Sequence, residues 1–127
     1  MTEAYVLKQM VSLTHTPFQI VNRDGSVELG VGMRNVERLF YEKNHQMIAV
    51  ARERAREYPV IFAEKRLLFA VFPEDPVTGQ ILLAGPVVSR ALSREQLIEV
   101  RREWKMGKTD YQPPVMSIKK MVSMMLL

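Results

Sequence analysis

The sequence contains no cysteine and only two histidines. The lack of cysteine excludes disulfide bonds, thiolate metal ligands and cysteine nucleophiles, and so few histidines argue against a structural zinc site. No apolar run approaches the ~20 residues of a membrane-spanning helix. The first residues also lack the basic start and apolar stretch of a signal peptide. We therefore expect a cytoplasmic protein with no metal, no cofactor and no membrane partner.

What is present is typical of a globular domain: 127 residues, of which 47% are hydrophobic and 25% charged. The net charge is +4, but the two signs are interspersed. Arg52, Arg54 and Arg56 alternate with Glu53 and Glu57. Such a mixture indicates a solvated helix face and not a phosphate-binding surface. We expect no direct contact between these residues and DNA.

No motif predicts a catalytic site. His15 and His45 are separated by a predicted strand pair, and neither adjoins a recognisable nucleophile. The glycines of residues 30–32 lack the third glycine and the βαβ context of a dinucleotide-binding loop. The carboxylates of Glu74 and Asp75 lie in a predicted turn, where solvation explains them. We expect the protein not to be an enzyme.

The local patterns predict an α+β fold, in which about five antiparallel strands are flanked by helices. Asp24-Gly25 is a favoured hairpin turn, Asn35 is a candidate helix N-cap, and Ser93 with Gln96 forms a capping box. Apolar periodicity and turn residues set the remaining boundaries. The expected helices cover residues 3–13, 35–58 (with an interruption at 42–46) and 94–105, and the expected strands cover 18–21, 27–31, 60–63, 67–72 and 81–88.

The last two strands are apolar on both faces, so both faces of the sheet must be covered. The helices account for one face, and the other requires a second layer or a pocket. Because alternate strand residues share a face, one set is the candidate ligand-binding surface. Gly85, followed by Pro86, marks either a strand end or a close approach to a ligand. The candidate ligand-binding residues are Phe62, Phe69, Val71, Leu83 and Gly85.

Residues 113–127 read as the start of a connecting helix that opens with two prolines and is cut short. Val115, Ile118, Val122 and Met125 are spaced by three, four and three residues, which is the spacing of a helix–helix seam. An exposed apolar seam invites association. We expect these four residues to form a dimerisation or signalling surface. The alternative is a helix that docks on its own domain, residues 1–112.

The order of these elements, the Thr14-His15-Thr16-Pro17-Phe18 stretch and the strand end Leu83-Ala84-Gly85-Pro86-Val87 resemble a known family. They are similar to the N-terminal sensory region of bacterial AraC-type transcription regulators, in its PAS/GAF-like variety. The resemblance implies a homodimeric sensor of a small-molecule effector. It also implies that DNA is bound only by a C-terminal helix-turn-helix domain outside this chain. The alternative is an interaction or dimerisation domain without a small ligand, whose sheet is covered by its own side chains.

Overall fold

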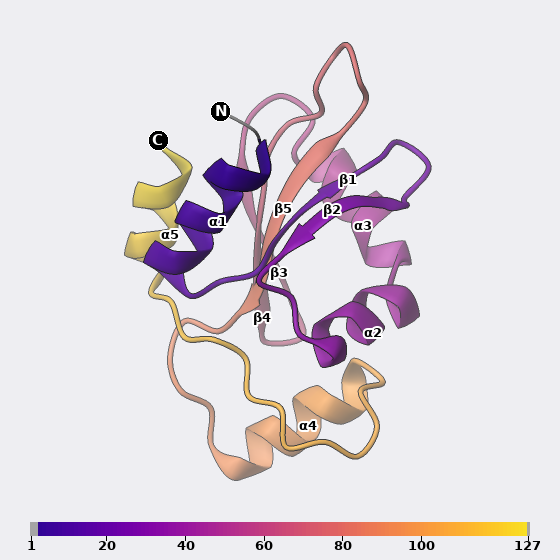
Figure 1. Ribbon diagram of the computed structural model, residues 1–127. Coiled ribbons are helices and arrows are strands. Elements are labelled where there is room, and N and C mark those ends of the chain that lie inside the picture. The colour runs from indigo at the N-terminus through magenta and orange to yellow at the C-terminus, as the bar shows by residue number, and fades with distance from the viewer. Residues whose placement is uncertain (1–2, 127) are drawn as a thin grey trace.

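One antiparallel sheet lies between two layers of helices in the computed structural model, which describes residues 3–126 (Figure 1). The strand order is β2-β1-β5-β4-β3, and every neighbouring pair is antiparallel. This arrangement confirms the predicted α+β class. The elements are α1 (Glu3–Thr14), β1 (Phe18–Val21), β2 (Val27–Val31), α2 (Asn35–Lys43), α3 (Gln46–Arg54), β3 (Val60–Glu64), β4 (Leu67–Val71), β5 (Ile81–Val87), α4 (Arg94–Glu103) and α5 (Ile118–Met125).

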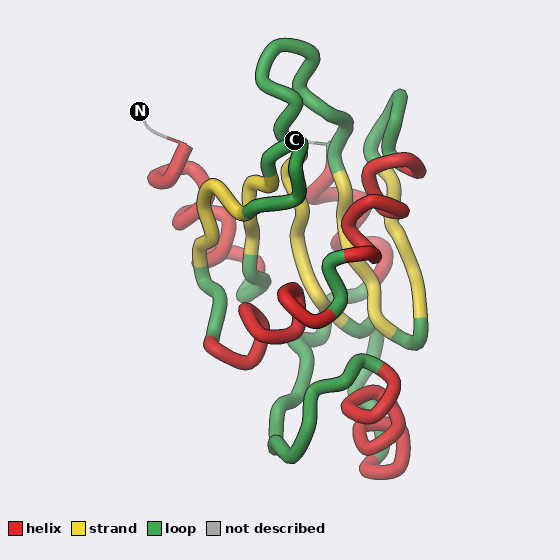
Figure 2. Tube along the Cα trace, turned by 90° about the vertical axis from the view of Figure 1, so that its right-hand side faces the viewer, coloured by secondary structure: helices red, strands yellow, loops and turns green. Residues whose placement is uncertain are grey.

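Both faces of the sheet are covered by helices, which settles the choice between a second layer and an open pocket. On one side, here called the α2–α3 face, the sheet packs against α2, α3 and Trp104 at the end of α4. On the other, the α1–α5 face, it packs against Met10 and Val11 of α1 and Met121 and Met124 of α5. Figure 1 shows α1 and α5 together on the side of the sheet opposite α2 and α3. In Figure 2, viewed from the α2–α3 side, the loops gather at the two ends of the strands.

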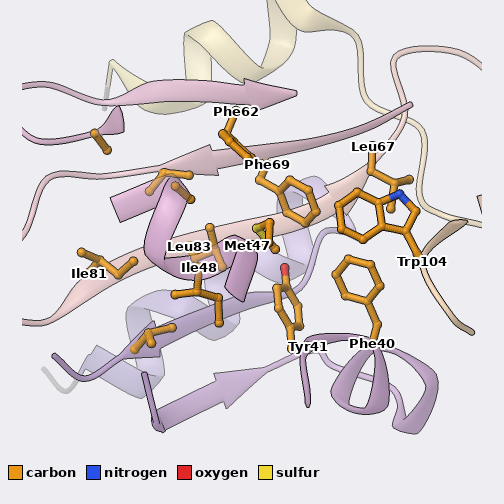
Figure 3. Packing of buried hydrophobic residues seen from close by; sticks show 14 of the residues in the cluster. Phe40, Tyr41, Met47, Ile48, Phe62, Leu67, Phe69, Ile81, Leu83 and Trp104 are labelled. Carbon is orange, nitrogen blue, oxygen red and sulfur yellow. The ribbon is translucent and has the colours of Figure 1, made fainter. Parts of the chain in front are cut away.

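Aromatic side chains fill the α2–α3 face (Figure 3). Phe40 stacks on Phe69 with ring centroids 6.0 Å apart, and Trp104 lies 5.0 Å from Phe40 and 6.1 Å from Phe69. The Trp104 indole N–H donates to the Lys65 carbonyl oxygen at 3.0 Å. The amide of Asn44 donates to the carbonyl oxygens of Phe40 and Trp104, at 2.9 and 2.8 Å. These contacts join α2, the turn before β4 and the end of α4 into one unit.

Two local expectations are confirmed and one is wrong by a residue. The interruption at residues 42–46 does divide the long helical stretch into α2 and α3, and Ser93 does cap α4 in a capping box with Gln96. The N-cap of α2, however, is Arg34 and not Asn35. The Glu37 side chain accepts from the Arg34 backbone N–H at 3.0 Å, and this bond sets the start of the helix.

The predicted start of the last helix is also wrong, because α5 begins at Ile118 and not at residue 113. Residues 114–116 pair with Val88, the residue after β5: the Val88 N–H donates to the Pro114 carbonyl at 2.9 Å, and the Met116 N–H donates to the Val88 carbonyl at 2.8 Å. Ser117 then caps α5 by accepting from the Lys120 N–H at 3.1 Å. Val115 therefore lies in a bridge to the sheet and not on a helix.

Replacing Gly85 with alanine is expected to destabilise the protein strongly. Gly85 has φ = 133°, and an added Cβ would lie 2.9 Å from the Leu68 carbonyl oxygen and 3.0 Å from the Phe69 ring. Because that oxygen belongs to the backbone of β4, a central strand would have to move. We expect the free energy of unfolding, measured by urea denaturation, to fall by about 2–5 kcal/mol, from backbone strain and overcrowding together.

Gly107→Ala is the matched control. Gly107 also has a positive φ, of 70°, but an added Cβ would meet no atom within 4 Å. For Gly107→Ala the free energy of unfolding should fall only by the cost of backbone strain, about 1–2 kcal/mol. Equal losses in the two variants would show that the approach of β4 to Gly85 is not what requires glycine.

Candidate functional site

Four of the five predicted ligand-binding residues do share one face of the sheet, but other side chains already contact them. Phe62, Phe69, Val71 and Leu83 are each at most 3% exposed and belong to the core of the α2–α3 face. The backbone and ring that approach Gly85 are those of β4. Their contact with a ligand stays a prediction. The side chains from the helices that pack in the same core are Phe40, Tyr41, Met47, Ile48 and Trp104.

A cleft of about 350 Å³ lies beside this core, between the β1–β2 hairpin and the helices α2 and α3. The apolar part of its lining includes Val27, Met33 and Ile48. The polar part comes mainly from α2 and the turn after it. The lining residues are Gly25, Ser26, Val27, Gly30, Met33, Arg38, Tyr41, Glu42, His45 and Ile48. Such a mixture suits a small, partly apolar molecule.

Gln19 lies directly behind the wall of this cleft. Its register partner on β2 is Gly30, which lines the cleft, and its side chain is near the Tyr41 hydroxyl, whose pKa it lowers. Gln19 is only 1% exposed, yet neither its amide oxygen nor its amide nitrogen has a hydrogen-bond partner among residues 3–126. Buried polar groups are nearly always paired. Sequence reasoning missed this residue, although a glutamine in the apolar strand Phe18–Val21 was a usable signal.

Tyr41 forms the boundary between the cleft and the core. Its hydroxyl donates to the Gly85 carbonyl oxygen at 2.8 Å, so it connects α2 to the end of β5. Burial raises the pKa of Tyr41 well above its ordinary value of 10.0, and the nearby Tyr111 and Glu37 raise it further. The hydroxyl therefore stays protonated and acts as a donor at neutral pH.

A buried carboxylate on the same helix holds the segment that leads to α5. Glu37 is 1% exposed, and it accepts a hydrogen bond from the Tyr111 hydroxyl at 2.8 Å. The Arg34 guanidinium lies 4.7 Å from the Tyr111 ring centroid and 3.4 Å from the Glu37 carboxylate. Arg101 donates twice to the Tyr111 carbonyl oxygen, at 3.1 and 2.8 Å. Tyr111 is thus fixed between α2 and α4.

Most of the predicted seam of the last helix faces away from the sheet, but Met125 packs against the core of the α1–α5 face. Val115, Ile118 and Val122 are 56%, 52% and 44% exposed, and Met125 is half-buried. The opposite side of α5 is anchored by Met121 and Met124, which are 1% and 5% exposed. The helix therefore docks on its own domain and still presents an apolar surface. A shallow groove of about 350 Å³ adjoins it, lined by Pro59, Ile61, Val122, Met125 and Leu126.

Within residues 3–126, no group of three or more histidine, aspartate or glutamate side chains is placed to hold a metal ion. In the same part of the chain, no helix has the length and apolar character needed to cross a membrane.

Comparison of the chain with protein-family models, with curated proteins and with solved structures gives no match.

Removing the Tyr111 hydroxyl is expected to destabilise the protein at neutral pH, because the buried Glu37 carboxylate would lose a donor. We expect Tyr111→Phe to lower the free energy of unfolding by about 1–3 kcal/mol. Tyr58→Phe is the control, since Tyr58 is 66% exposed, and it should change stability by less than about 0.5 kcal/mol. Urea denaturation followed by circular dichroism measures both. A neutral Tyr111→Phe would contradict the role assigned to this bond.

The same variant should respond less to alkaline pH. Burial, and then the charge of Glu37, raises the pKa of Tyr111, whereas in the unfolded chain it ionises near its ordinary 10.0. The unfolded state therefore releases a proton that the folded state keeps. The contribution of this tyrosine to the free energy of unfolding is complete below about pH 10. Above that pH it falls by up to about 1.4 kcal/mol per pH unit for each buried tyrosine whose pKa is raised. Wild type, with both Tyr41 and Tyr111, should lose more stability than Tyr111→Phe.

Proposed function

We propose that this chain is the regulatory domain of a bacterial transcription regulator, which binds a small effector in the cleft and transmits its binding to α5. The observation that carries the proposal is that helix α2 contacts both the cleft and the segment that leads to α5. Arg38, Tyr41 and Glu42 of α2 line the cleft, and Glu37 of the same helix holds Tyr111. A shift of α2 would therefore move Tyr111 and the segment that leads to α5.

The segment from Tyr111 to α5 is short, and backbone hydrogen bonds hold it to Val88. After Tyr111 the chain pairs with Val88 through Pro114 and Met116, and α5 starts at Ile118. A ligand changes such a system only through its different affinity for two states. In the proposed mechanism, the bound effector favours one position of α2. This position of α2 determines the position of the segment 111–117, and through it the position of α5. The position of α5 in turn decides whether a partner can bind to its exposed seam.

The AraC-type assignment is supported by the sequence resemblance and by a sheet flanked by helices, as a PAS/GAF-like sensor requires. In this proposal the protein is cytoplasmic and has no catalytic role. It contacts DNA only through a domain outside the residues described. The seam of Ile118, Val122 and Met125 is the surface through which α5 would signal or dimerise.

Small molecules that bind the cleft should stabilise the protein. A ligand at 100 times its Kd adds about 2.7 kcal/mol, which raises Tm by several degrees for a domain of this size. We expect a thermal-shift screen of metabolites to yield such molecules, and Gly30→Val to abolish their effect. Gly30 lines the cleft, and a side chain there meets first the flexible end of Met33, with Sδ 3.0 Å from an added Cβ.

Transmission from the cleft to α5 can be tested by NMR with the molecules that the thermal-shift screen identifies. The chain carries nine methionines, so their labelled methyl groups report on each region by NMR. A molecule from the screen should shift the signals of Met33 in the cleft and of Met121 and Met124 under α5. In Tyr111→Phe the Met33 shift should persist and the α5 shifts should shrink. Binding that shifts Met33 alone in wild type would rule out transmission to α5.

A second candidate, a dimerisation domain without a small ligand, is favoured by the filled core at Phe69 and Leu83 together with the exposed α5 seam. It predicts that the chain is a dimer in sedimentation and that Val122→Asp is a monomer. Val77→Asp is the matched control, since Val77 is 89% exposed in the loop before β5 and outside the groove. A wild-type chain that stays monomeric at high concentration would exclude this candidate.

A further inference from the structure

Gln19 is a buried polar group whose amide lacks a well-formed hydrogen bond to any described residue, although it lies near enough to the Tyr41 hydroxyl to lower the pKa of Tyr41. It occupies the second position of β1, between Leu83 on β5 and Gly30 on β2, and its side chain faces α2. Among residues 3–126 its amide makes no hydrogen bond within geometric limits, although it is 1% exposed. An apolar side chain of the same size would suit this position better for stability, since an unpaired buried amide is costly.

We propose that Gln19 is the polar anchor of the cleft and recognises an uncharged ligand with a lactam or carboxamide edge. The inference rests on the proposed effector site and specifies its ligand. A primary amide offers one donor and one acceptor side by side. A ligand edge with an N–H next to a C=O satisfies both at once, through two parallel hydrogen bonds.

The surroundings of the Gln19 amide argue that this ligand edge is neutral. Its neighbours Gly30, Tyr41 and Leu83 carry no charge, and Glu37 would repel an anion because its field already reaches Tyr41. The charged residues of the cleft, Arg38 and Glu42, are exposed at its rim. Burying an anion next to Gln19 would require a positive counter-charge that this inner part of the site lacks. A cation would find only Glu37, whose carboxylate is already paired with Arg34 and Tyr111.

Gln19 does not itself line the cleft, but its register partner Gly30 does, so in this proposal the ligand reaches Gln19 past Met33 and Gly30. The Met33 thioether lies against Gly30, where an added Cβ would be 3.0 Å from its sulfur. Methionine is flexible and adapts to irregular apolar surfaces, so a ligand can displace it without moving the backbone. Val27 and Ile48 then contact the apolar body of the ligand. Gly30 thus leaves open the side of the site that any larger residue would close.

The test uses the whole chain and two probes, quinolin-2-one and its N-methyl derivative, which lacks the lactam N–H. In an NMR titration, quinolin-2-one should shift the side-chain amide signals of Gln19, identified by their loss in Gln19→Met. It should bind about tenfold or more tightly than the N-methyl derivative. The methyl group removes the N–H donor, and its bulk keeps the lactam C=O away from the Gln19 amide, so both hydrogen bonds are lost. Gln19→Met should weaken quinolin-2-one by a similar factor and raise the Tm of the ligand-free protein. Gln112→Met, at an exposed position, should change neither.

Three outcomes of the probe experiment would overturn the inference: no binding of quinolin-2-one, equal binding of the two probes, or a lowered Tm in Gln19→Met with unchanged binding. The last would show that the amide is satisfied within the folded protein. A molecule from the thermal-shift screen that depends on Gly30 but not on Gln19 would also overturn it while leaving the proposed function intact. If no molecule depends on Gly30, the effector site itself is refuted.

Discussion

The structure depends on a sheet whose central strands are apolar on both faces. β4 and β5 send Phe69, Val71 and Leu83 to one side and Ala70 and Ala84 to the other, and all of these are buried. Neither face can be left to water, so each recruits its own helices. The aromatic side chains, which are larger, lie on the α2–α3 face and pack against Phe40 and Trp104. The smaller alanines on the α1–α5 face let α1 and α5 approach through methionine side chains.

This asymmetry explains where a ligand can bind. The middle of the α2–α3 face is closed by interlocking aromatic rings, which leave the predicted pocket residues in contact with protein. The hairpin β1–β2 lies at the edge of the sheet, beyond these rings, and carries Gly30 where a larger side chain would fill the space. A cleft with a polar residue behind it therefore forms beside β2, two strands away from β5, which carries the nearest of the predicted residues.

Helix α2 combines structural and proposed regulatory roles because Glu37 serves several partners. Its carboxylate caps the helix through the Arg34 N–H and receives the Tyr111 hydroxyl. A buried carboxylate needs its full set of donors, so the position of the helix start and the position of Tyr111 are coupled. A change at the cleft side of α2 thus has a defined route to the segment before α5.

The sequence by itself determined the order of the helices and strands, apart from the start of the last helix, and the shared face of Phe62, Phe69, Val71 and Leu83. Short-range signals carry this information: alternation in strands, the Ser93–Gln96 capping box and the break between α2 and α3. It also placed Ile118 and Val122 on one face of the last helix, and the structure leaves that face exposed. The spacing of apolar residues along the chain decides which of them share a face of a helix or strand, and this does not depend on the rest of the fold.

Only the tertiary structure decided which spaces are filled and which polar groups meet. The pairing of Glu37 with Tyr111 joins residues 74 positions apart, and the start of α5 depends on the bridge between Val88 and residues 114–116. The isolation of Gln19 follows from three strands and a helix at once. These features depend on distances between segments that are remote in the chain, and no periodicity within one segment encodes such distances.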